Sequence, residues 1–330
     1  MKMKLLRRKF LALAVGAAAL AVLFTALAGQ AAWAQAARTI KIVVPFPPAG
    51  GSDILARMLA DQVGRAQGPT MVVENRPGAG SVIGTEAVSR AAPDGNTLLI
   101  NTANIVIAPH VRNLNYDPLS SFEPICYVVN TPLLVVVNSA SPYRTLADLL
   151  NAARAKPGEL SVASVGPATT LHVAFEKLKR AANVNMIYVP YPGTAPATTA
   201  LLGEHVTSMI AEHPAVVEQL NFGKLRALAT GSRTRIESLP DVPTIAESGY
   251  SDFEIDIWWG LFAPANTRKE TAAQLAGWFS AATKAPELKP KFAGQGFRPV
   301  GMCGTDFGLF LRKQYDEYGR VIREANIKGE

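Results

Sequence analysis

The 330-residue chain lacks the short motifs that mark many nucleotide-binding and hydrolytic enzymes. Neither G-x-G-x-x-G nor G-x-x-x-x-G-K-[ST] occurs, so neither type of phosphate-binding loop is encoded. No G-x-S-x-G nucleophile elbow occurs, and the four histidines stand in no zinc spacing such as H-E-x-x-H. We therefore expect no enzyme, no metal site and no cofactor. An enzyme would need a catalytic constellation assembled from distant residues.

Clustered basic residues occur at the N-terminus and nowhere else. Five stand before Phe10 without an acid among them, an apolar run follows over Leu11–Ala28, and small residues follow at Ala32 and Ala34. This order predicts a cleavable secretory signal peptide over residues 1–36, with a transmembrane anchor as the alternative. The Arg7-Arg8 pair also resembles a twin-arginine signal, with plain Sec export as the other route.

Removing those five basic residues lowers the net charge from +7 to +2 and leaves no Lys/Arg cluster. We therefore expect no nucleic-acid partner. The chain has two cysteines, Cys126 and Cys303. In an oxidising compartment they either form one disulfide or stay as buried thiols, and the sequence leaves both possibilities open.

Residues 38–330 are long for one core and sufficient for two. Ile40–Val44 predicts a strand, and Ile54–Val63 behind it predicts a helix with one apolar side. This cycle of strand and helix repeats, with further strands expected at Met71–Val73, Leu98–Ile100, Leu133–Val137, Leu160–Ala163, Met186–Val189 and Val206–Ile210. The alternation predicts an α/β fold whose largely parallel sheet is covered on both faces.

Three loops rich in small residues, at residues 45–53, 165–172 and 189–196, each lie between a predicted strand and the helix after it. In the first, Gly50 and Gly51 allow a tight turn that exposes backbone N–H groups. Free N–H groups at a helix N-terminus favour an anion such as a carboxylate. One such loop alone is more often a simple turn. Three together indicate one anion-binding cleft at the carboxyl ends of the strands.

These loops carry motifs that resemble the Bug (TctC-like) family, and the similarity runs in order along nearly the whole chain after residue 38. The segments that carry it are Pro45–Asp53, Val73–Gly80, Gly84–Glu86, Ala92–Gly95, Val189–Pro196, Gly223–Leu228, Leu239–Thr244 and Trp259–Pro264.

The resemblance implies a two-domain periplasmic binding protein of type II, a Venus flytrap whose α/β domains close on a ligand between them. It implies a periplasmic receptor that captures a small carboxylate, either a di- or tricarboxylate or an aromatic acid. The receptor would deliver it to the membrane permease subunits of a tripartite tricarboxylate transporter. We expect a monomer, with domain 1 at residues 38–131 and 227–330 and domain 2 at residues 132–226. A sensor subunit for a signalling kinase would use the same trap and is the alternative function.

The resemblance also implies that backbone amides, hydroxyl groups and bridging waters hold the ligand's carboxylates. The expected ligand-binding residues are Phe46, Pro48, Ala49, Gly50, Gly51, Ser52, Asp53, Thr102, Ala103, Asn104, Gly166, Ala168, Thr169, Thr170, His172, Tyr191, Gly193, Thr194, Ala195 and Glu212. His172 is as well interpreted as a structural hydrogen-bonding histidine. Trp258 and Trp259 either stack on an aromatic ligand or belong to a strand core, and the core is favoured.

Two acids in this set leave the ligand class open. Many relatives carry aspartates where this chain has Thr207 and Ala211, and an asparagine or similar residue at the position of Glu212, so the ligand's identity cannot be carried over. If Glu212 or Asp53 faces the cleft ionised, it would repel a carboxylate and favour a hydroxyl or ammonium group on the ligand. The alternatives are a helix-capping role for Asp53 and a solvated or capped loop position for Glu212.

Overall fold

The computed structural model describes residues 38–167, 169–325 and 327. The predicted signal peptide (1–36) and the predicted ligand contact Ala168 lie outside the described residues. In chain order the elements are β1 (Thr39–Val44), α2 (Gly51–Gln67), β2 (Thr70–Asn75), the 3-10 turn η1 (Ala79–Ser81), α3 (Val82–Ser89), β3 (Thr97–Thr102), α4 (Asn104–Ile107), the 3-10 turn η2 (Ala108–His110), β4 (Phe122–Asn138), α5 (Leu146–Ala155), β5 (Ser161–Val165), α6 (Thr170–Ala181), β6 (Ile187–Tyr191), α7 (Thr194–Leu202), β7 (Ser208–Glu212), α8 (His213–Asn221), β8 (Leu225–Thr230), β9 (Asp256–Pro264), α9 (Lys269–Lys284), α10 (Lys289–Gly294), β10 (Arg298–Cys303) and α11 (Thr305–Ala325).

Local sequence accounts for the first strand and helix. Ile40 and Ile42–Val44 of β1 are buried, as expected for a strand covered on both faces, whereas Thr39 is exposed and Lys41 half-buried. α2 buries Leu55, Leu59 and Val63, which lie four residues apart on one face. The helix ends at Gly68, whose left-handed backbone (φ 87°) lets its N–H donate to the Gly64 carbonyl. The first βα unit therefore places its turn, residues 45–50, at the carboxyl end of β1.

The strands form one mixed sheet in the order β2-β1-β3-β9-β4-β7-β5-β6, with β10 and β8 also paired to β4. Pairing is parallel between β1 and its neighbours β2 and β3, and between β5 and its neighbours β6 and β7. Every pairing of β4 and β9 is antiparallel. The prediction of a largely parallel sheet is therefore wrong for its centre, because two long antiparallel strands lie between the βαβ units.

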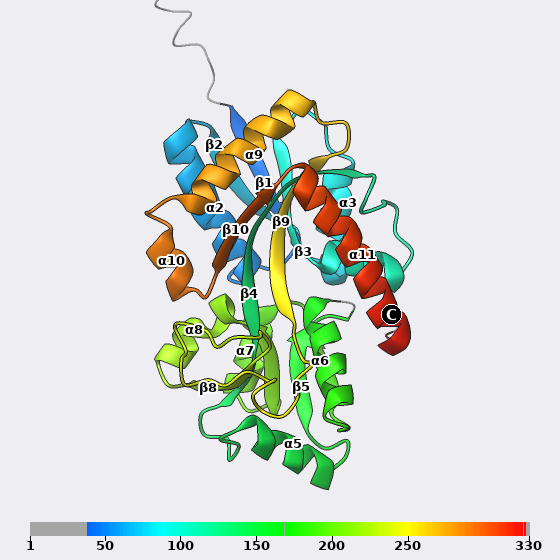
Figure 1. Cartoon of the computed structure of the whole chain (residues 1–330), viewed down its shortest axis with the longest axis vertical. Coiled ribbons are helices and arrows are strands. Elements are labelled where there is room, and N and C mark those ends of the chain that lie inside the picture. The colour runs from blue at the N-terminus through cyan, green and yellow to red at the C-terminus, as the bar shows by residue number, and fades with distance from the viewer. Residues whose placement is uncertain (1–37, 168, 326, 328–330) are drawn as a thin grey trace, which may run out of the picture. The chain divides into compact units, whose positions relative to one another are not determined.

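β4 passes through both halves of the sheet, and Figure 1 shows it running between them. Its first part pairs with β9 and β10 and its last part with β7 and β8; the change falls between Pro132, opposite Asp256, and Leu133, opposite Glu212. We call the elements around β1, β2, β3, β9 and β10 the first lobe. Those around β5, β6, β7 and β8 are the second lobe.

The expected domain boundary after Thr131 lies one residue before this change of partners. The other expected boundary, between Arg226 and Ala227, falls inside β8, which pairs with β4 in the second lobe. The segment after β8 also bonds to this lobe, since the Ile245 N–H donates to the Thr230 carbonyl and the Lys177 ammonium donates to the Glu254 carbonyl. We propose that the second lobe spans residues 133–255.

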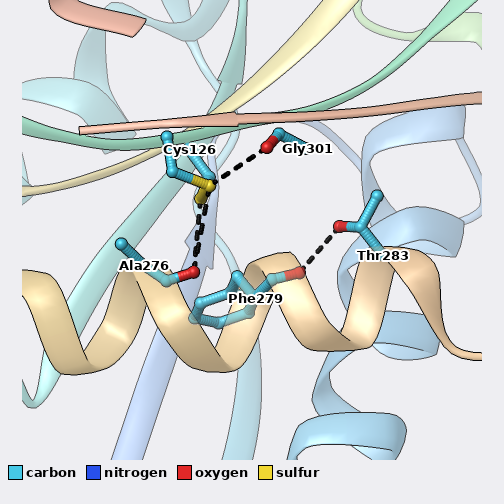
Figure 2. Close-up of a disulfide and its surroundings, with 6 residues drawn as sticks. Cys126, Ala276, Phe279, Thr283 and Gly301 are labelled. Atoms are coloured by element: carbon cyan, nitrogen blue, oxygen red, sulfur yellow. Dashed lines mark hydrogen bonds between the residues drawn. A yellow bond between two sulfur atoms is a disulfide. The ribbon is translucent and has the colours of Figure 1, made fainter. Parts of the chain in front are cut away.

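Cys126 and Cys303 form a disulfide that ties β4 to β10, where the two residues lie opposite each other. Figure 2 shows the bridge above α9. The Ala276 carbonyl oxygen lies 3.6 Å from the Cys126 Sγ. Of the two alternatives that the sequence left open, the structure has the disulfide. It attaches the strand that precedes the C-terminal helix to the centre of the sheet.

Candidate functional site

A cleft with about 450 Å³ of empty space, part of it open to solvent, lies where strand ends of both lobes meet. Its walls come from the loops after β1 and β3, from β9, and from the loops after β5, β6 and β7. The lining residues are Phe46, Pro47, Gly50, Ser52, Thr102, Asn104, Val165, Thr169, Thr170, Leu171, Gly193, Thr194, Glu212, Ile257 and Trp259. The cleft thus lies at the carboxyl ends of parallel strands, where ligands bind in open α/β sheets.

Asp53 supports the first loop and is not among the residues that line the cleft. Its carboxylate accepts hydrogen bonds from the Ala49 N–H and the Arg57 Nε, each at 3.0 Å. Burial acts to raise the pKa of Asp53, but the hydrogen bonds from Arg57 and Ala49 outweigh it and hold the pKa below its ordinary value. An ionised Asp53 therefore stabilises the turn at Ala49, whose φ is 63°. The expected N-cap role for Asp53 is therefore wrong, because Gly50 holds the N-cap position; Asp53 lies in the first turn of α2, and its carboxylate reaches back to the loop before the helix.

Glu212, at the end of β7, points its carboxyl group at the beginnings of two helices. Its Oε1 accepts hydrogen bonds from the Gly51 N–H of α2 at 3.3 Å and from the Thr194 hydroxyl of α7 at 2.8 Å. The residue is buried, with 8% of its surface exposed, and Oε2 has no hydrogen-bond partner among the residues that the structure describes. Burial raises the pKa of Glu212, and the hydrogen bonds from Thr194 and Gly51 act against this rise.

Asn104, the first residue of α4, also points its side chain at the beginning of another helix, in this case α6. Its Oδ1 accepts from the Thr170 N–H at 2.9 Å and from the Thr170 hydroxyl at 3.1 Å. Asn104 belongs to the first lobe and Thr170 to the second, so these bonds cross the cleft, as does the bond between Gly51 and Glu212. Side-chain oxygens of the protein therefore already satisfy one N–H group each of α2 and α6.

Trp259 forms part of the cleft wall from β9. Its indole Nε1 donates to the Ser52 hydroxyl at 2.8 Å, and its ring packs edge-on against Phe297. Successive strand residues point to opposite faces. Ile257 therefore shares the cleft face with Trp259, whereas Trp258 packs among the aromatic side chains of the first lobe. The core interpretation holds for Trp258, and Trp259 also lines the cleft.

Ten of the residues predicted from the sequence line the cleft: Phe46, Gly50, Ser52, Thr102, Asn104, Thr169, Thr170, Gly193, Thr194 and Glu212. Others lie in the same loops but outside its lining: Pro48, Ala49, Gly51, Asp53, Ala103, Gly166, His172, Tyr191 and Ala195. His172 stacks on Tyr188 with 4.3 Å between ring centroids, and burial lowers its pKa. The sequence interpretation missed Pro47, Val165, Leu171, Ile257 and Trp259; apolar alternation on β9 was the one signal for the last two.

The cleft combines hydroxyl and amide donors with apolar surface and a single acid. Of the described residues that line it, Glu212 alone carries an ionisable side chain. Within the described ranges no group of His, Cys, Asp and Glu side chains could hold a metal ion, and no helix there is long and apolar enough to cross a membrane. The arrangement is suited to binding a small polar molecule.

Two α/β lobes with such a cleft between them define the class of two-domain periplasmic binding proteins, and solved structures of that class share the fold. The chain matches the family model described as "Tripartite tricarboxylate transporter family receptor" (TctC) over residues 55–327. It belongs to this family, whose members are substrate-binding proteins rather than enzymes, and the resemblance seen in the sequence is confirmed.

Individual relatives agree with this assignment. Protein BugT of Bordetella pertussis (strain Tohama I) is 35% identical over 315 residues, which cover 93% of this chain and 96% of BugT. The structure of the periplasmic binding protein BugD is 33% identical with a TM-score of 0.85, covering 89% of this chain and 99% of that one. The structure of R. palustris Rpa4515 with adipate is 29% identical with a TM-score of 0.86, again covering 89% and 99%.

Proposed function

We propose that this chain is a periplasmic receptor that captures a small carboxylated solute between its lobes. It delivers the solute to the membrane permease of a tripartite tricarboxylate-type transporter. The observation that carries the proposal is the cleft itself, around which α2, α6 and α7 begin. Membership of the receptor family and the similarity to an adipate-bound protein support it.

Carboxylate binding in this cleft would rely on donors that are already in place. The first amides of a helix have no partner within the helix, and its N-terminus carries partial positive charge. Thr169 and Leu171 at the beginning of α6 and Gly193 and Thr194 at the beginning of α7 bring such amides to the cleft lining, whereas the Thr170 N–H already donates to Asn104. Because the helices hold these donors fixed, little conformational entropy is lost when the ligand binds.

Capture would be completed by movement of the lobes about β4 and the segment before β9. Hinge closure of this kind is how periplasmic binding proteins enclose their ligands. The ligand would shift the equilibrium between the open and closed forms toward the closed form, which the permease would then recognise. We propose that the receptor acts as a monomer and is exported to the periplasm by a cleavable signal peptide over residues 1–36.

A thermal-shift screen of the exported protein against a panel of small organic acids, with and without amino groups, tests the proposed function. A ligand that binds only the native state raises the melting temperature, by an amount that grows with its concentration relative to Kd. We expect a clear rise with at least one acid, and NMR spectra of the mixture should show that acid unchanged after incubation. No rise across the panel would contradict carboxylate capture, and conversion of the bound acid would indicate an enzyme.

A further inference from the structure

We infer that Glu212 makes this cleft select a small carboxylic acid that also carries an ammonium group, as an amino acid does, over the simple acid of the same length. The inference rests on the proposed function and narrows its ligand class. Among the described residues that line the cleft, Glu212 alone has an ionisable side chain.

Within the described part of the chain, Glu212 is hydrogen-bonded through one carboxyl oxygen and not through the other. Oε1 is anchored by the Gly51 N–H and the Thr194 hydroxyl, whereas Oε2 is buried without a hydrogen-bond partner among the described residues. Buried carboxylate oxygens in native proteins are nearly always hydrogen-bonded, so each exception requires an explanation. A donor supplied by the ligand would satisfy Oε2.

The charge balance of the cleft favours a cationic donor. No Lys, Arg or His is among its lining residues, so no basic side chain there pairs with Glu212. A buried charge is costly unless it is paired, and a ligand ammonium would form a charge-assisted hydrogen bond. Pairing with a cation also favours the ionised carboxylate, which opposes the effect of burial on the pKa of Glu212.

The ligand's carboxylate requires a separate position, and the beginning of α6 offers one. Thr169, Thr170 and Leu171 line the cleft there, and the side chain that meets this helix end is the neutral Asn104. The helix ends of α2 and α7, in contrast, already hold the carboxyl group of Glu212. The cleft is therefore bipolar, with anion-binding amides at α6 and an acid at the end of β7.

Isothermal titration calorimetry with matched pairs of acids tests the inference. The pairs are succinate with aspartate, glutarate with glutamate, and butyrate with 4-aminobutyrate, each measured with the full exported protein. Loss of a hydrogen bond to a buried charge costs enough that we expect the amino member of at least one pair to bind tighter by about tenfold or more. In Glu212→Gln, which keeps the acceptor for Gly51 and Thr194, this preference should disappear.

Glu218→Gln is the matched control, since it makes the same change on the exposed side of α8 and should keep the preference. Equal or tighter binding of the simple acids by the unaltered protein would overturn the inference while leaving the proposed function intact. That result would indicate a protonated Glu212 whose hydroxyl donates to the acid. A preference that survives in Glu212→Gln would also overturn it. Binding of no acid of either kind would contradict the proposed function itself.

Discussion

Removal of the Thr194 hydroxyl should destabilise the protein more than removal of a neighbouring hydroxyl of the same kind. Thr194 is buried, with 4% of its surface exposed, and its hydroxyl donates to the Glu212 Oε1 at 2.8 Å. Thr198, one turn later on α7, is 7% exposed and donates to the Thr194 carbonyl at 2.9 Å. Substitution by Val at each position removes the hydroxyl and keeps the shape, so the two variants differ mainly in the charge of the acceptor.

The expected magnitudes follow from that difference. A hydrogen bond to a charged group contributes about 1.5–3 kcal/mol, and a neutral one about 1 kcal/mol. For a chain of this size the entropy of unfolding is roughly 0.6 kcal/mol per degree. Thr194→Val should therefore lower Tm by about 3–5 °C, and Thr198→Val by about 2 °C. Thr194→Val should also weaken binding of the amino-acid ligand, because Glu212 loses one of the two donors that orient it.

Differential scanning calorimetry at neutral pH measures both Tm values, and titration calorimetry measures the affinities. Equal losses of Tm in the two variants would refute the reasoning, since the Thr194 bond would then be worth no more than a neutral one. An affinity that falls equally in both would show that orientation of Glu212 is unimportant for binding.

Three further predictions concern the bridge, the closure of the cleft and pH. The disulfide between Cys126 and Cys303 joins positions 177 residues apart, so replacing both cysteines by Ala should cost about 2–5 kcal/mol and lower Tm by about 3–8 °C. A calorimetric change below about 2 °C would contradict this, and ligand affinity should not change. A Cβ on Gly193 would lie 2.7 Å from the Pro47 Cγ across the cleft, which is too close for the lobes to keep this approach. Gly193→Ala should therefore weaken ligand binding by about 5- to 100-fold in titration calorimetry. Unchanged affinity would show that the bound form does not bring these residues together. The raised pKa of Glu212 means that the unfolded chain ionises at lower pH than the folded one, so stability of the unliganded protein should fall as pH rises from the unfolded to the folded pKa. Burial also raises the pKa of Asp256, to about 6, so scans from pH 4 to 8 should show a smaller loss in Glu212→Gln than in the unaltered protein, and parallel curves would contradict this.

Much of the secondary structure was predictable because it depends on neighbouring residues. The strand at Thr39–Val44 and the helix at Gly51–Gln67 follow from apolar runs and periodicity. The antiparallel centre of the sheet was not predictable in this way. β4 extends over Phe122–Asn138, and its last residues alone stood out in the sequence. Its partners β9 and β10 come more than a hundred residues later, and pairing at that distance leaves no local pattern.

The loops of the cleft were predictable for a chemical reason, whereas the walls from β9 were not. Small residues between a strand and a helix mark positions where the backbone N–H groups are free. Ile257 was predicted only as a buried strand residue, and for Trp259 a strand core was favoured over stacking on a ligand, because an apolar strand pattern does not show what each face contacts. The division of roles between Asp53 and Glu212 was likewise undecided.

By itself the sequence determined the family and the α/β class, because these depend on local motifs in a given order. Tertiary structure decided which acid belongs to the cleft. Asp53 bonds within its own turn, to Ala49 and Arg57. Glu212 meets the Gly51 N–H, 161 positions away. Whether a carboxyl group is paired, solvated or buried with a free oxygen depends on neighbours brought together by folding, and no local pattern encodes that environment.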